Sequence, residues 1–348
     1  MVVDSLGKVV GRRPAGVERR AAERWVKRAR PLGPSAPAWA RAMYRRSLFV
    51  LRALTDRNGA VIAGARQGWA YVWPRDAAAA ALAYAAVGDR RDARRVARFL
   101  LSLDLGAAAR FYPDGAPVPA RAAQGDAWGW VSVAARAAGL PAPRGGGIST
   151  SSSKSDSPPD WRDRADYQEK DAGDYLGNAL ASPDSPHGET HRRAISPPMR
   201  FTVLVRWVGD PGSGVDSAAA WAVRPFPHPT LFPAVRRSLD RLLACCQGRF
   251  GLVPSQHWPG DDPWTAPTAW TAWAYATLAG VDRQDGRRSL TKRDRRKALH
   301  LMSDLRRAAT PVGLLPERVD ARTGAPRSTT PLAWSHAFAI LALRQLWP

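Results

Sequence analysis

The sequence predicts an all-α protein built as a two-layer toroid of helices, and three observations lead to this fold class. Apolar residues recur at three- and four-residue spacing through most of the 348 residues, whereas the strict alternation typical of β-strands is nearly absent. Some helical segments are apolar almost all round, as in residues 332–345 (LAWSHAFAILALRQ), and such a helix is covered by other helices. Basic amphipathic segments alternate with these apolar ones and suit an outer layer.

Each predicted helix rests on its own periodicity and end signals. The helix at 36–55 stops before an Asn-Gly pair, and the helix at 266–279 ends at Gly280. The last helix follows Thr330-Pro331, which suits an N-cap with proline at the first helical position. In chain order, the predicted helices cover residues 36–55, 77–87, 91–103, 122–138, 216–223, 231–246, 266–279, 291–308 and 331–346.

The remaining segments are assigned by composition. Residues 141–198 are rich in Pro, Gly and Ser and have little periodicity, so a low-complexity loop region is expected there. The run FTVLVRWV at 201–208 fits a strand and a buried helix equally well. We expect one domain over residues 18–348, preceded by a weakly ordered tail at residues 1–17.

The net charge of +22 is the most pronounced feature of the composition. Such a charge is common in nucleic-acid-binding proteins. Arginine carries nearly all of it, however, in doublets scattered along amphipathic helices, so solvated helix faces explain it better than a nucleic-acid groove. A basic, helical nucleic-acid-binding protein is therefore the least favoured of three functional hypotheses.

Several other classes find no support in the sequence. No apolar run approaches the roughly 18–20 residues needed to cross a bilayer, and residues 1–13 lack the apolar segment of a secretory signal. The expectation is a soluble, cytoplasmic protein without membrane contact. The six histidines form no HExxH motif, and CxxC, P-loop and GxGxxG motifs are absent, so no metal and no cofactor is expected.

The chemistry-bearing residues are acids set among aromatic residues in loops that precede helices. An isolated Asp before a helix is more often an N-cap than a functional group. Here the acids recur in five ordered segments, which are WPRD at 73–76, QGD at 124–126, DYQEK at 166–170, GRFGLVPSQHWPGDDPW at 248–264 and LLPERVDARTGAPRSTTPLAWSHA at 314–337.

Taken together, these motifs resemble glycoside hydrolase family 15, the glucoamylase-type enzymes, over about residues 40–345. The order of YVWPRD, QxD, GDDPW and LLPE…PLAWSHA carries the resemblance. It implies an (α/α)6 toroid and inverting hydrolysis that releases glucose from the non-reducing ends of α-glucosides. The implied partner is an oligosaccharide or small α-glucoside; the oligomeric state stays open.

The resemblance also implies roles for individual residues. Glu317 of LLPE matches the general base, and Arg75 and Asp76 match the pair that binds the hydroxyls of the terminal sugar. Further substrate-contacting positions are Trp73, Asp126, Arg249, Trp264 and Trp334. These types suit a sugar, because tryptophan covers the apolar ring face while an Arg-Asp pair binds the polar edge.

The general acid is the point at which the chain departs from the family pattern. Asp166-Tyr167-Gln168-Glu169 is the best match to a family segment in which tryptophan stands where Gln168 stands here. Glu169 is therefore the candidate acid, and Glu189 is a poorer second. If neither serves, the chain is a non-catalytic sugar-binding relative, which is the second of the three hypotheses.

Overall fold

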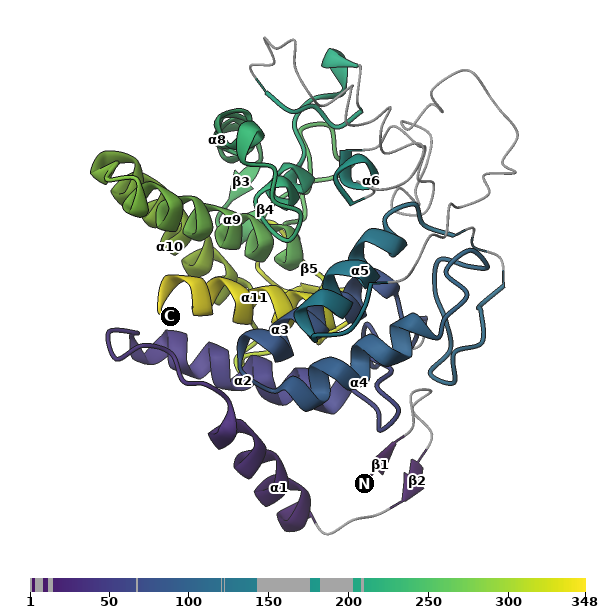
Figure 1. Ribbon diagram of the computed structural model, residues 1–348. Helices are drawn as coiled ribbons and strands as arrows, with labels where there is room; N and C mark the ends of the chain where they lie inside the picture. The colour runs from purple at the N-terminus through teal and green to yellow at the C-terminus, as the bar shows by residue number, and fades with distance from the viewer. Residues whose placement is uncertain are drawn as a thin grey trace.

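The computed structural model describes residues 2–3, 9–11, 15–66, 68–119, 121, 123–142, 176–181, 203–207 and 210–348. These residues form the predicted two-layer toroid of helices with a few two-residue or three-residue strands, so the all-α, (α/α)6-type prediction is confirmed (Figure 1). Of the predicted tail at 1–17, the described part holds β1 (Val2–Val3) and β2 (Val9–Gly11), which pair antiparallel, and the start of α1 (Ala15–Arg28).

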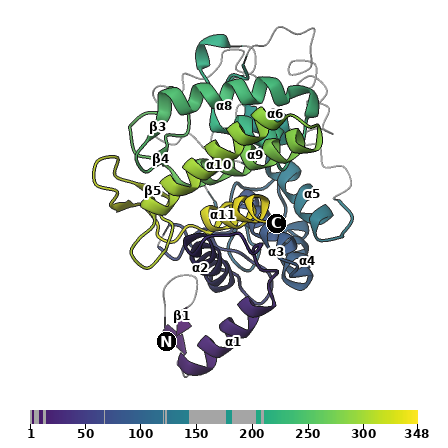
Figure 2. The ribbon, with the colours of Figure 1, turned by 90° about the vertical axis from the view of Figure 1, so that its left-hand side faces the viewer.

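The inner layer consists of elements whose side chains are buried on nearly every side, as their apolar sequences predict. Neighbours around the ring pack on one another: α3 lies between α11 and α5, α6 between α5 and η3, and α9 between η3 and α11. Figure 2 looks along α11, with the C-terminus of the chain toward the viewer. The inner elements are α3 (Pro74–Ala86), α5 (Ala127–Ala137), α6 (Leu176–Ala181), the 3-10 helix η3 (Ser217–Ala222), α9 (Thr265–Gln284) and α11 (Ala333–Leu346).

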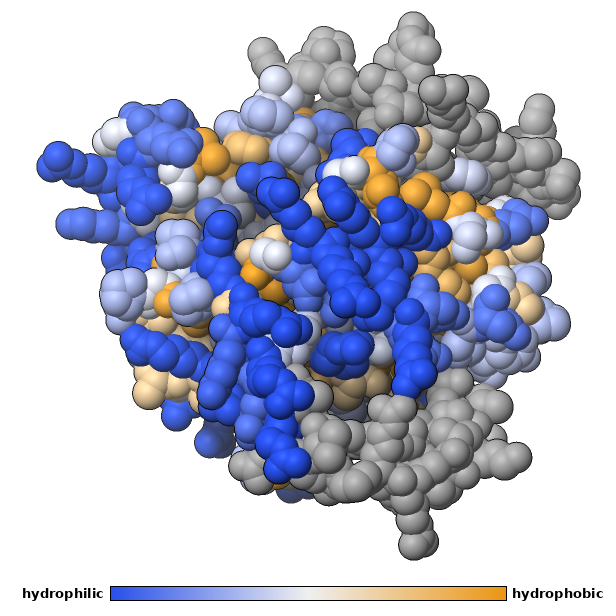
Figure 3. All heavy atoms as spheres, turned by 60° about the horizontal axis from the view of Figure 1, so that its bottom comes forward, coloured by the Kyte–Doolittle hydropathy of each residue, from blue (hydrophilic) through white to orange (hydrophobic). Residues whose placement is uncertain are grey.

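The outer layer consists of amphipathic helices that bury one face and expose the other. Within α4 (Arg90–Leu101), for example, Val96 and Leu100 are buried whereas Arg91, Arg94 and Arg98 are exposed. Figure 3 views the side on which α1, α2 and α4 lie, and hydrophilic side chains cover most of it. The other outer helices are α2 (Ala38–Leu54), α8 (Phe232–Cys246) and α10 (Arg288–Ala308).

Two short antiparallel hairpins follow the outer helices at one end of the toroid. The pair β3 (Gln247–Gly248) and β4 (Gly251–Leu252) comes after α8, and the pair β5 (Arg318–Val319) and β6 (Pro326–Arg327) comes between α10 and α11. Isolated bridges from Trp264 to Leu252 and to Arg318 join the two hairpins through the residue that precedes α9. The remaining 3-10 turns are η2 (Pro211–Ser213) and η4 (Pro229–Leu231).

Helix ends account for most differences from the sequence-based expectation. Helix α9 does not end at Gly280 but continues to Gln284, and a Cβ at Gly280 would lie 3.3 Å from Nε2 of Gln345 on α11. This glycine therefore serves a close helix–helix approach instead of a helix end. Helix α11 begins at Ala333 with Leu332 as its N-cap, so Thr330 does not cap it. The ambiguous run at 201–208 is neither strand nor α-helix over its described residues 203–207.

Gly129 on α5 gives a test of the inner-layer packing. A Cβ there would overlap the carbonyl oxygen of Ala181 on α6, which is backbone and cannot move aside cheaply. We expect Gly129→Ala to lower the free energy of unfolding by about 1–3 kcal/mol through overpacking, measured by urea denaturation. Gly106→Ala is the matched control, because the nearest atom to its Cβ, an oxygen of Asp104, lies at 3.5 Å. Equal effects of the two substitutions would contradict this packing.

Candidate active site

The sequence-predicted site residues gather at the N-terminal ends of the inner helices. Trp73 is the N-cap of α3, and Arg75 and Asp76 lie in its first turn. Asp126 is the N-cap of α5, Trp264 is the N-cap of α9, and Trp334 is the second residue of α11. Because these ends meet at one end of the ring, residues from distant parts of the chain share one site.

Asp76 lies in the first turn of α3, and its carboxyl group accepts a hydrogen bond from its own main-chain N–H, so it still stabilises the start of that helix. Asp126 is not a side-chain cap of α5, which was the competing interpretation, because α5 has no side-chain capping hydrogen bond at this N-cap residue. Instead, Nη1 of Arg75 donates to Oδ2 of Asp126 in a buried ion pair, with the aspartate side chain only 1% exposed. Within the described residues, Oδ1 of Asp126 has no hydrogen-bond donor. The Arg75–Asp126 pair therefore links the starts of α3 and α5 and keeps one acceptor unused.

Asp76 and Glu317 form the second electrostatic feature of the site. Burial raises the pKa of Asp76 to about 7; Arg75 opposes this increase, while the negative charges of Glu317 and Asp126 add to it. Burial also raises the pKa of Glu317 to about 7, with a hydrogen bond from Ser328 and the charge of Arg318 acting in the opposite direction. The two carboxyl groups are thus close enough to interact and titrate near neutrality.

The main chain around Glu317 is held on both sides. Its N–H donates to the carbonyl oxygen of Thr329 at 2.9 Å, and its carbonyl oxygen accepts from the N–H of Thr265 at 3.0 Å. Ser328, whose side chain donates to the Glu317 carboxyl group, has a φ of 65°. A left-handed conformation is rare for a residue other than glycine, and such residues are concentrated at functional sites.

His336 supports the same loop from behind. The N–H of Leu315, two residues before Glu317, donates to Nε2 of His336 at 3.0 Å. Nε2 is therefore the unprotonated nitrogen, and Nδ1 donates to Oγ of Ser47 on α2 at 2.9 Å. Complete burial, helped by the charge of Arg46, lowers the pKa of His336 to about 3, so this histidine stays neutral. It orients the loop and does not itself transfer protons.

Tryptophan rings form the walls around the Arg75–Asp126 pair. The guanidinium carbon of Arg75 lies 5.3 Å from the ring centroid of Trp334 and 5.8 Å from that of Trp221. Several of these indoles have an N–H that is buried without an acceptor among the described residues, which is an unusual concentration of unused donors. They are Trp73, Trp128, Trp130, Trp221, Trp264 and Trp334. An indole combines a flat apolar face with a polar edge, which matches the surface of a sugar ring.

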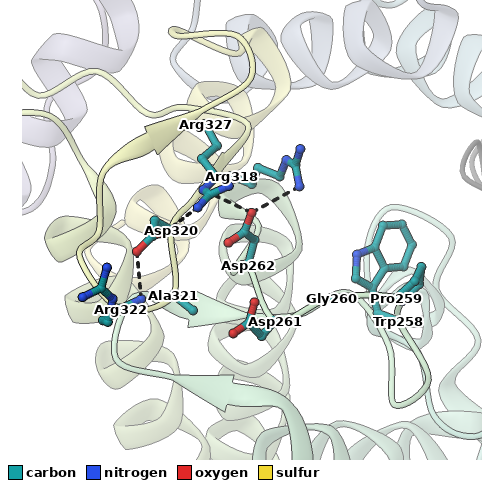
Figure 4. A pocket seen from close by; sticks show the side chains of 10 residues that line it. All are labelled: Trp258, Pro259, Gly260, Asp261, Asp262, Arg318, Asp320, Ala321, Arg322 and Arg327. Carbon is teal, nitrogen blue, oxygen red and sulfur yellow. Dashed lines mark hydrogen bonds and ion pairs between the residues drawn. The ribbon is translucent and has the colours of Figure 1, made fainter.

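A cavity of about 350 Å³ is lined by Arg318, the first residue of β5, together with residues 258–262, 320–322 and Arg327 (Figure 4). Glu317 is 4% exposed, whereas the neighbouring Arg318 points into this cavity and pairs with Asp262 at 3.2 Å. Asp262 also forms an ion pair with Arg327 at 3.5 Å. Trp258 lies on the opposite side of the cavity from these three charged side chains. The ring of Trp258 packs edge-on against Trp264 at 5.2 Å. The cavity therefore borders the loop that carries Glu317.

One predicted site residue, Arg249, is not brought into this cluster. Arg249 lies exposed in the turn between β3 and β4; its guanidinium lies 5.3 Å from the ring of Phe250 and its carbonyl oxygen accepts from Arg307. This position gives its predicted substrate contact no support. Glu169, the candidate general acid, lies outside the described residues, as does Glu189.

Other residues of the cluster were not singled out from the sequence. Trp221 is embedded in an alanine-rich segment and Ser328 in a Ser-Thr-Thr run, so neither has a local pattern that marks it. Trp128 and Trp130 follow QGD directly, and their spacing from Asp126 was the one available signal.

Two further properties concern ions and membranes. Within the described ranges, no group of three or more His, Cys, Asp or Glu side chains is arranged to hold a metal ion. None of the described helices combines the length and the apolar character that a membrane span requires.

Comparison with known proteins was made on both sequence and structure. No family model and no curated protein matches the sequence. Among solved structures, a wild-type glycosidase covers 89% of this chain and 98% of its own length, with a TM-score of 0.65 and 18% identity. The match to the glucoamylase from Saccharomycopsis fibuligera covers 93% of this chain and 95% of that enzyme, with a TM-score of 0.63 and 14% identity. The fold is that of the glucoamylases.

A third solved structure is similar to this chain over only part of its own length. A bacterial glucoamylase solved with acarbose has a TM-score of 0.59 and 15% identity; the match covers 87% of this chain but 55% of that one. The solved neighbours are (α/α)6 toroid enzymes, which agrees with the ring of inner helices described above. At identities of 14–18%, the likeness concerns the fold and leaves the activity to be argued from the site.

Proposed function

We propose that the protein is an inverting glycoside hydrolase that releases glucose from the non-reducing ends of α-glucosides such as maltooligosaccharides. One observation carries the proposal: a buried Glu317 interacts with Asp76 beside the Arg75–Asp126 pair, at the end of the inner helices where the indoles converge. The glucoamylase-like fold supports it, and so do solved neighbours that include a glycosidase variant in complex with glucose.

Each group has a distinct role in this proposal. Glu317, when ionised, takes a proton from a water molecule, and that water attacks the anomeric carbon from the face opposite the leaving group. Asp76 and Arg75 bind hydroxyls of the terminal glucose, and Trp334 and Trp73 cover its ring. A second carboxyl group must protonate the leaving oxygen. Glu169 is the candidate for that step.

The proposal is tested by glucose release from maltose, isomaltose and trehalose, with the anomer followed by proton NMR. Inverting hydrolysis frees the non-reducing glucose as the β-anomer, whereas a retaining enzyme frees it as the α-anomer; the leaving glucose keeps the anomeric configuration that it has in the substrate. The absence of any initial excess of β-glucose over the amount supplied by the leaving glucose, or no release from any of the three sugars, would overturn the proposal. Binding of maltotriose without turnover, lost in Asp76→Ala, would instead establish a non-catalytic sugar-binding protein.

The pH dependence follows from the pKa of Glu317. A general base must be ionised, and its pKa is raised to about 7, so kcat/KM is expected to fall as the pH drops below about 7. Ser328→Gly removes the hydrogen bond that lowers this pKa, while glycine accepts a φ of 65° without strain. The acid limb of the pH profile should therefore move upward, by a few tenths to about one pH unit.

Arg318→Gln gives an independent check on the same shift. It removes the positive charge that also lowers the pKa of Glu317, so its acid limb should move in the same direction. A downward movement in either variant would contradict the assignment of this limb to Glu317.

A further inference from the structure

A second pocket lies at the opposite end of the inner helices from Glu317. Its volume is about 530 Å³, within the range of small-molecule sites. Leu82 near the end of α3, Val133 near the end of α5 and Leu341 near the end of α11 line it, with Trp273 from the middle of α9. These helices contribute their N-terminal ends to the candidate active site, so the rear pocket, as we call it, is a separate site.

The lining of the rear pocket divides into an apolar part and a charged part. Four of the side chains are those just named, and Pro225 and Pro227 add further apolar surface. The charged part consists of Arg136, Arg224 and Arg344, and none of the residues lining the pocket is acidic. Three cations around an apolar floor favour a ligand that is both anionic and apolar.

The arginines are not all explained by the helices that carry them. Arg136 and Arg344 lie in the last turns of α5 and α11, where a cation offsets the negative end of the helix dipole. Arg224 has no such role, because it lies in the loop after η3. Burial lowers the pKa of Arg344; Tyr44 opposes this decrease, and the positive charge of Arg30 adds to it.

We propose that the rear pocket binds a small molecule that joins a flat apolar ring to a phosphate group. Arg136 and Arg224 are exposed and would bind the anion at the opening; Arg344 is half-buried, and its Nη1 donates to the carbonyl oxygen of Pro31, so it adds positive charge beside them. A phosphate dianion with three acceptor oxygens uses three cations better than a single carboxylate does. The ring lies on Trp273 and the aliphatic side chains beneath. The paucity of uncharged polar side chains, with Gln345 the one in the lining, disfavours a free sugar there.

The test is isothermal titration calorimetry of the full chain with 1-naphthyl phosphate, with inorganic phosphate and 1-naphthol as the two separate halves of this probe. We expect one site per chain and an affinity for 1-naphthyl phosphate at least tenfold higher than for either half. The Arg136→Gln/Arg224→Gln double variant should weaken binding by tenfold or more. Glu317→Gln should leave it unchanged, which separates this site from the proposed hydrolase site.

The matched control is Arg45→Gln/Arg91→Gln, which removes two exposed arginines from α2 and α4 and changes the net charge equally. It should bind 1-naphthyl phosphate as the wild type does. Trp273→Leu should lower the affinity for 1-naphthyl phosphate more than that for inorganic phosphate. The proposal is overturned by absence of saturable binding, by equal binding of inorganic phosphate, or by equal loss in the control. It is also overturned if the Arg136/Arg224 variant only lowers Tm and binds as before.

Discussion

Glu317→Gln is expected to lower kcat on maltose by about 10²–10⁴-fold while KM changes little, because the amide cannot accept a proton from water. The substitution keeps the shape of the side chain. The main-chain hydrogen bonds to Thr265 and Thr329 do not involve the carboxyl group and are retained. The measurement is the initial rate of glucose release over a range of maltose concentrations.

The control for this experiment is Asp114→Asn, which neutralises an exposed carboxylate in the loop before α5. It should leave kcat within about twofold, since surface substitutions of this kind change little. If Glu317→Gln retained full kcat, Glu317 would not be the base. A large increase in KM with unchanged kcat would show that the residue only binds sugar.

Arg75→Met should have the largest effect on stability. It leaves Asp126 buried without its cation, and breaking a buried ion pair by removing one partner costs about 3–5 kcal/mol in the free energy of unfolding. Sugar binding should be lost as well if, as proposed, Arg75 and Asp76 bind the hydroxyls of the terminal glucose. Urea denaturation monitored by far-UV circular dichroism measures the first effect. Arg45→Met, at an exposed position of α2, is the control and should change stability by less than about 0.5 kcal/mol.

The double variant Arg75→Met/Asp126→Leu separates stability from function. Replacing both partners by apolar side chains removes the unpaired charge, so much of the lost stability should return, while sugar binding stays absent. If the double variant were as unstable as Arg75→Met alone, the pair would not be the reason for the loss. Recovery of binding together with stability would show that the pair has no direct role toward the sugar.

The helices could be predicted because the spacing of their apolar residues indicates which of their faces are buried. The segment at 332–345 is apolar all round, and the structure places it in the inner layer as α11. Ends were harder to predict, since they depend on neighbours. Gly280 was expected to end a helix, but the contact that explains it is with Gln345 on another helix, which no local pattern reveals.

The sequence motifs identified residues of the candidate site, but they did not indicate which of these residues contact one another. WPRD, QGD and LLPE located Arg75, Asp126 and Glu317, yet the ion pair between Arg75 and Asp126 joins positions 51 residues apart. Trp221 lies near Arg75 only because η3, which carries it, belongs to the same ring of inner elements as α3. The motif at 248–264 predicts a substrate contact for Arg249 that stays a prediction, since the turn between β3 and β4 leaves this side chain exposed beside Phe250.

The hydrogen bond between His336 and Ser47 has a consequence for how the chain reaches its native state. It joins positions 289 residues apart, and α11 also packs on α3, so the ring closes only between segments that are distant along the chain. High contact order slows folding, because the entropy of closing a long loop is lost before the distant contacts form. During synthesis, the N-terminal helices α2 and α3 emerge first, and the apolar faces that pack on α11 stay exposed until α11 has been synthesised. Until then the loop with Glu317 lacks the hydrogen bond between Leu315 and His336, so the candidate site is completed last in folding.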